Sequence, residues 1–108
     1  MAEQTMAIFK AGVPIFTILQ DPHRQQILVM LCRTDQMTVN QITAQVALSR
    51  PAVSHHLKLM LDAGIVAVNQ TGTERYYRAN MGPTLKLLRE LTASLEADIA
   101  SQQSSQNN

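Results

Sequence analysis

The sequence is poor in the residue types that cross-link or stiffen small folds. It contains no tryptophan, and its aromatic side chains are two phenylalanines and two tyrosines. Cys32 is its one cysteine, which excludes an internal disulfide. We therefore expect an aliphatic core, and the lone thiol favours a reducing, cytoplasmic setting.

Long apolar runs and a secretion signal are also missing. A membrane-spanning helix needs about 20 consecutive apolar residues, and no segment approaches that length. The start of the chain has no basic region leading into an apolar one, so we predict neither a membrane partner nor a signal peptide. With 108 residues, of which 45% are hydrophobic, the chain suits a single domain.

Catalytic motifs are absent as well. No carboxylate pair, Ser/His/Asp set or phosphate-binding loop occurs at a usable spacing. We therefore predict no enzyme activity and no cofactor.

The net charge of the chain is small, but the positive charge is unevenly distributed along it. The formal net charge is only +1. Between Arg50 and Arg78, however, four basic residues face two acidic ones, an excess of two positive charges. This excess is too thin for one copy to bind phosphates strongly, whereas two copies would double it.

Breaks and periodicity divide the chain into short helices. Gly12 and Pro14 predict a break between helices at residues 2–11 and 13–20, and Asp21 with Pro22 marks the start of the next helix. Apolar residues recur at helical spacing after Pro83. We expect one domain over residues 1–100 and a disordered polar tail over 101–108.

The segment from Thr38 to Ala79 is the most informative. Thr38 caps a helix, a three-residue turn follows, and Ser49 caps a second helix that ends at Gly64. Two strands, at residues 65–69 and 74–79, then form a hairpin. This order predicts a mainly α fold with a small β-hairpin, the winged helix-turn-helix.

The second helix of this unit has two different faces. Val53, Leu57, Met60 and Leu61 fall on one side and should pack inward, and His56 at the edge of that side is expected to pack or to form hydrogen bonds. The opposite face is small and polar, which suits a DNA major groove. Its alternative is an ordinary solvated surface. We predict DNA contacts from Arg50, Pro51, Ser54, His55 and Lys58.

Further contacts are predicted on either side of this helix. Arg75 lies nearer the hairpin tip than Arg78 and is expected to reach DNA, although an ordinary surface hairpin would look the same. Thr38, Asn40 and Gln41 can contact phosphate through side chains and free N–H groups. Helix capping alone explains Thr38 equally well.

The stretches DPHRQQIL, LSRPAVSHHLKLMLDAGIV and ERYYRA resemble the ArsR/SmtB group of bacterial winged-helix repressors, over roughly residues 13–79. The resemblance implies a homodimeric repressor that an effector releases from a palindromic operator on double-stranded DNA. It also implies a dimer interface on the first and last helices. The residues expected there are Met6, Phe9, Leu85, Leu88, Leu91, Leu95 and Ile99.

The chain departs from this group at its metal sites. Many members bind metals through cysteines at positions held here by Thr38 and Asn40, and others use histidine on the last helix, where this chain has none. No metal site is therefore carried over, and the effector stays unidentified. Cys32 is expected to be a buried structural thiol, with a redox sensor as the alternative. A winged-helix protein-interaction module is the other alternative.

Overall fold

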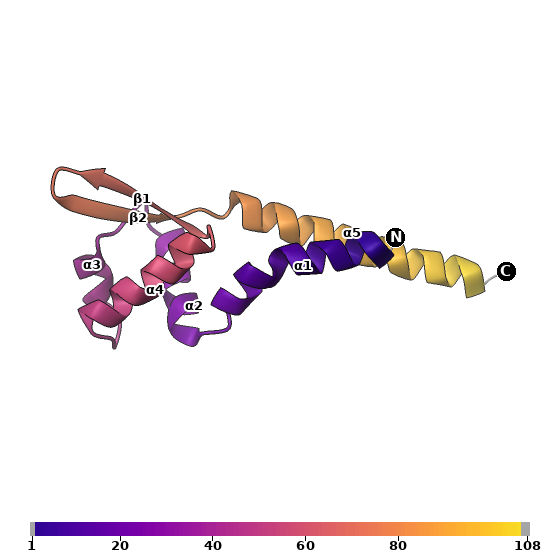
Figure 1. The fold of residues 1–108 in the computed structure, drawn as a ribbon, viewed down its shortest axis with the longest axis horizontal. Helices are drawn as coiled ribbons and strands as arrows, with labels where there is room; N and C mark the ends of the chain where they lie inside the picture. The colour runs from indigo at the N-terminus through magenta and orange to yellow at the C-terminus, as the bar shows by residue number, and fades with distance from the viewer. Residues whose placement is uncertain (1, 107–108) are drawn as a thin grey trace.

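The protein consists of a compact body and a long helical arm. The computed structural model describes residues 2–106, and its principal extents are 64 × 26 × 21 Å. α2, α3, α4 and the β1–β2 hairpin form the body, whereas α1 and α5 lie side by side as the arm; α1 begins partway along α5, which continues to the far end of the arm (Figure 1). The elements are α1 (Ala2–Ile18), α2 (Pro22–Cys32), α3 (Val39–Thr43), α4 (Arg50–Asp62), β1 (Val66–Thr71), β2 (Glu74–Ala79) and α5 (Gly82–Gln106).

The helices of the body begin at the caps that the sequence predicts. Asp21 Oδ1 accepts hydrogen bonds from the first free N–H groups of α2. Thr38 and Gln41 form a reciprocal capping box at α3, and Ser49 Oγ accepts from the N–H of Ala52 at α4. These local bonds fix where α2, α3 and α4 begin.

The hairpin is antiparallel, and β2 is paired on both of its edges. β1 begins one residue later and ends two residues later than expected, and Gly72 supplies a positive φ of 63° at the tip. Tyr77 pairs with Val68 on β1 and exchanges two backbone hydrogen bonds with Met37 on its other side. The hairpin is thereby tied to the residue that precedes the Thr38 cap.

The core is aliphatic, as the composition predicts. Tyr77 is the one aromatic side chain among its described members. The side chains that are less than 2% exposed are Ile27, Leu31, Ile42, Leu57, Met60, Ile65, Val53, Val66 and Thr84. All except Thr84 belong to the body, where burying each large aliphatic side chain stabilises the fold by about 1.5–3 kcal/mol.

The predicted break at Gly12 and Pro14 is wrong, because α1 runs unbroken from Ala2 to Ile18. Pro14 costs one helical hydrogen bond, but packing against α5 holds both halves in line. A Cβ on Gly12 would stand 3.1 Å from Leu87 Cδ2, so the helices approach closely there. Near the start of α1, the Thr5 hydroxyl forms hydrogen bonds with Ser94 and Asp98 of α5.

α5 is longer than expected and runs from Gly82 to Gln106. It is helical through residues 101–106, so the predicted disordered tail is wrong there, and residues 107–108 lie outside the described part. Extending an existing helix through serine and glutamine costs little free energy per residue. No helix within residues 2–106 is long and apolar enough to cross a membrane.

Arg24 joins three helices at the base of the body. Its Nε donates to the Ile18 carbonyl at the end of α1 at 2.6 Å, and its Nη1 lies 3.2 Å from His56 Nδ1 on α4. Because arginine can only donate, His56 Nδ1 must accept. This confirms that His56 is a hydrogen-bonding residue, and it links the arm to α4.

The contacts around Arg24 change the pKa values of two ionisable groups, His56 and Asp21. Burial is the largest effect on His56 and lowers its pKa; Asp21 opposes this, while Arg24, His23 and His55 add to it. For Asp21, desolvation acts to raise the pKa, but the N–H groups of Arg24 and His23 and the charges of Arg24 and His56 together lower it. The fold thus favours neutral His56 beside ionised Asp21.

We predict that thermal stability falls as the pH drops below about 6.5. Because the folded pKa of His56 lies below its ordinary value of 6.5, the unfolded chain binds the proton more tightly, and stability is fully present only above that pH. His56→Gln should show a smaller decrease in melting temperature between pH 7.5 and 5.0. The matched variant His55→Gln, at an exposed position, should keep most of the wild-type decrease, because His55 has the smallest effect on the His56 pKa. Equal pH dependence in all three proteins would contradict this role.

Candidate nucleic-acid interface

An open groove of about 560 Å³ runs between α4, the start of α3 and the hairpin. It flanks α4 next to the core, because Leu61 lines it and also packs on the core, and the hairpin forms one wall. Its lining residues are Thr38, Val39, Asn40, Arg50, Ser54, Lys58, Leu61, Asp62, Thr73, Glu74, Arg75 and Tyr77.

The buried residues of α4 fix the rotation of this helix about its axis, and so the direction of its exposed residues. Val53, Leu57 and Met60 are completely buried. Leu61 is half-buried, contacts the core and also lines the groove. Since a helix has one rotation about its axis, this buried row directs the polar residues away from the body.

The structure brings six of the nine predicted DNA-contacting residues to the groove, namely Thr38, Asn40, Arg50, Ser54, Lys58 and Arg75. The other three lie outside it. Pro51 and His55 are exposed on the outer ridge of α4, and Gln41 is exposed on α3. On α4, Arg50, Ser54 and Lys58 therefore form one wall of the groove, and Pro51 and His55 form an exposed ridge beside it.

One groove contact was not predicted from the sequence. Arg50 Nε donates to Asn40 Oδ1 at 2.7 Å, across the turn between α3 and α4. The sequence marked both residues, but nothing in it paired them. The only available signal is that each lies in the first turn of its helix.

The cations of the groove differ in their surroundings. Lys58 Nζ lies 3.4 Å from Asp62 Oδ2 on the exposed surface of α4. The Arg75 guanidinium lies 5.8 Å from the centre of the Tyr77 ring. Within the part of the chain that the structure describes, neither Arg50 nor Arg75 forms an ion pair.

The histidines gather without forming a metal site. The ring of His56 lies 6.1 Å from that of His23 and 6.2 Å from that of His55. Within the described residues, no three His, Cys, Asp or Glu side chains are arranged to hold a metal ion. The histidines do not line the groove, whose side chains offer hydrogen-bond donors, acceptors and positive charge.

Cys32 is exposed, so the expectation of a buried thiol is wrong. It is the last residue of α2, one step beyond the buried Leu31, where the helix leaves the core. A shallow hollow beside it also contains Asp35 and Arg78.

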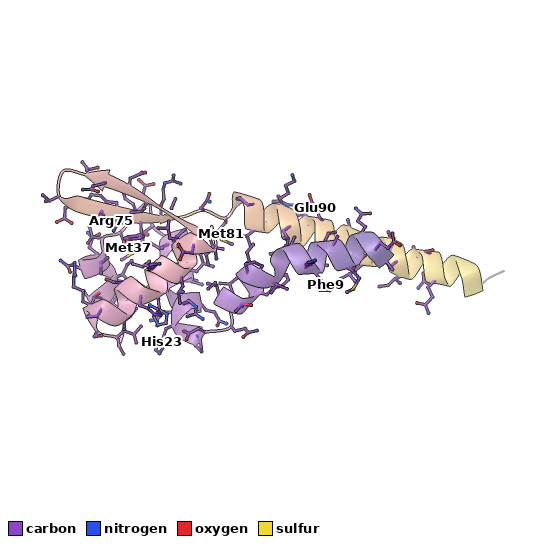
Figure 2. The ribbon with its side chains drawn as sticks, viewed as in Figure 1. Phe9, His23, Met37, Arg75, Met81 and Glu90 are labelled. Carbon is purple, nitrogen blue, oxygen red and sulfur yellow. The ribbon has the colours of Figure 1, made fainter. Side chains whose placement is uncertain are left out.

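The arm carries a second surface, which is apolar. Its members on α1 and α5 are all large side chains that are at least 39% exposed: Met6, Phe9, Val13, Leu85, Leu88, Leu95 and Ile99. Six of these were predicted from the sequence; Val13 was missed because a helix break was expected there. Leu91 is half-buried rather than exposed. Figure 2 shows Arg75 on the hairpin at one end of the molecule and Phe9 on the arm, well away from it.

Comparison with known proteins identifies the fold and the family. The sequence profile described as bacterial regulatory protein, arsR family, matches residues 21–68. An uncharacterised HTH-type transcriptional regulator of Methanocaldococcus jannaschii is 33% identical over 72 residues, which are 67% of this chain and 81% of that protein. The transcriptional repressor SdpR of Bacillus subtilis is 33% identical over 66 residues, 61% of this chain and 72% of that protein.

Solved structures share the whole architecture. An ArsR-like transcriptional regulator from Rhodococcus sp. RHA1 matches with a TM-score of 0.75 over 95% of this chain and 97% of that one, at 23% identity. The homodimeric winged helix-turn-helix DNA-binding domain of a Mycobacterium bovis protein matches with a TM-score of 0.66 over 95% and 93%, at 20% identity. The fold is thus a winged helix-turn-helix, and the chain belongs to the arsR family of bacterial regulatory proteins, which are transcriptional regulators and not enzymes.

Proposed function

We propose that this protein is a homodimeric repressor that binds a palindromic DNA operator. The observation that carries the proposal is the groove, which places three cations and several short polar side chains beside the outer ridge of α4. Membership of a family of transcriptional regulators supports it, as does the related repressor of Bacillus subtilis.

In this proposal α4 enters the major groove. That groove is about 12 Å wide and accepts an α-helix whose outer side chains are short. Ser54 and His55 would donate to or accept from base edges, and Pro51 would contact the groove wall. Lys58 would leave Asp62 for a phosphate, because an exposed pair of this kind is weak.

The elements on either side of α4 would hold the phosphates. Arg75 projects from the hairpin, which is anchored at Met37, and would contact the backbone or minor groove. Thr38 already uses its hydroxyl to accept from Gln41 N–H, so its contribution would come through the start of α3. Gln41 is exposed beside it.

Charge argues that two copies act together. The groove contains Arg50, Lys58 and Arg75 against Asp62 and Glu74, an excess of one positive charge. Because affinity for DNA depends strongly on the number of phosphates neutralised, one copy would bind weakly.

The exposed apolar row of the arm would form the dimer interface. Fully burying a side chain such as Leu88 or Ile99 is worth about 1.5–3 kcal/mol, and an unpartnered row of this length is unusual on a monomer. Paired arms would set two α4 helices about 34–36 Å apart, one turn of DNA. Any signal that changes the arm geometry would then release the operator.

Sequence preference is the first test. Wild-type protein should bind its own upstream DNA at least about tenfold more tightly than a random duplex at moderate salt, because phosphate contacts alone do not discriminate sequence. Fluorescence anisotropy with both duplexes measures this ratio. Equal affinities would favour the protein-interaction alternative instead.

The triple variant Ser54→Ala, His55→Ala, Lys58→Ala should lose at least about tenfold in affinity for that DNA, since each good base contact is worth about 1–3 kcal/mol. Its dimer should persist. Lys86→Ala is the matched control, because Lys86 pairs with Glu90 on α5 as Lys58 pairs with Asp62 on α4. Unchanged binding by the triple variant would remove this face from the interface.

Leu88→Glu should convert the dimer to a monomer of 12.0 kDa and weaken operator binding, because it buries a charge in the proposed interface. Analytical ultracentrifugation at micromolar concentration measures the mass. Val29→Glu is the control, since Val29 is equally exposed (45% against 41%) but lies on α2, away from the arm. A dimeric Leu88→Glu protein would contradict the assignment.

The exposure of Cys32 favours one specific signal, oxidation of its thiol. Peroxide should then weaken operator binding by the wild type but not by Cys32→Ser. If both proteins respond equally, or neither responds, Cys32 is not the sensor.

A further inference from the structure

The contact between Asn40 and Arg50 has a consequence for specificity. We propose that Asn40 is a positioning residue that presents Arg50 to a guanine, so that one G·C pair in each half of the operator is selected by the two residues together. This inference rests on the proposed function and adds to it the base pair that is read and the residue that sets the reading geometry.

The chemistry of the contact is unambiguous. An arginine guanidinium has only donors, so the acceptor at 2.7 Å must be the amide oxygen of Asn40. Asn40 lies in the capped first turn of α3, and Arg50 is the first residue of α4 after its Ser49 cap. Both backbones are therefore fixed, and the bond spans ten residues across the turn.

This bond uses the Nε–H group and leaves the two terminal NH₂ groups of Arg50. Fixing Nε restricts rotation of the guanidinium plane. The terminal groups then form a planar two-donor fork, which matches the O6 and N7 acceptors of guanine in the major groove. No other base offers two acceptors there, so the fork would exclude the remaining pairs.

The surroundings of Arg50 keep this fork available. It forms no ion pair with the residues described, unlike Lys58, which lies beside Asp62. Arg75 lies over the Tyr77 ring, on the hairpin. Arg50 is thus the one groove cation that is held by a neutral partner at its Nε, at the end of α4 where recognition helices contact bases.

A random-duplex selection followed by sequencing tests the proposal on the full-length protein. Wild type should enrich an inverted repeat with a strongly preferred G·C pair in each half. Arg50→Ala and Asn40→Ala should both relax that same pair and keep the rest of the repeat. Arg50→Lys should relax it too, because lysine keeps the charge but lacks the fork.

Binding affinities for the selected duplex measure the energetic coupling between Asn40 and Arg50. Arg50→Ala should weaken binding about 5- to 150-fold, and Asn40→Ala about 2- to 12-fold, the cost of ordering one long side chain. In the Arg50→Ala background, Asn40→Ala should have no further effect. Binding to a duplex with A·T at the preferred pair should not change with Asn40→Ala.

A purely structural role for Asn40 predicts different results. Asn80→Ala is the matched control, because Asn80 Nδ2 donates to the Gly64 carbonyl at 3.0 Å and does not line the groove. It should leave the selected pair unchanged. If Asn40→Ala weakens all duplexes equally, or acts equally with and without Arg50, the inference is overturned. If wild type enriches no repeat, the proposed function itself fails.

Discussion

The burial of one side of α4 is the constraint on which the interface depends. Val53, Leu57 and Met60 are fully enclosed by α2, α3 and the hairpin, and each would cost several kcal/mol to withdraw. Because these side chains permit one rotation of the helix, Ser54, Lys58 and the outer ridge have a fixed direction. The groove is therefore a consequence of the core.

The arm is also connected to α4 through direct contacts. α1 runs without interruption from the apolar arm surface to Ile15 and Ile18, which pack on the body core. Arg24 then ties the Ile18 carbonyl to His56 on α4. In the proposed dimer, a change in how the two arms meet would reach α4 through this short path, which would give the proposed repressor a means of release.

Local signals in the sequence predicted most of this structure. Asp21, Thr38 and Ser49 cap helices through bonds within three residues, so the body could be outlined from sequence alone. Gly12 and Pro14 were misinterpreted because the compensation comes from α5, far along the chain. The exposure of Cys32 and the pairing of Asn40 with Arg50 likewise depend on tertiary placement, which periodicity does not encode.

We propose that two copies of the protein present their α4 helices to one face of DNA. Footprinting of the bound operator at single-base resolution tests this most directly. The account predicts two protected major-groove segments, related by two-fold symmetry and centred 10–10.5 base pairs apart. A single protected segment, or protection that does not depend on sequence, would contradict it.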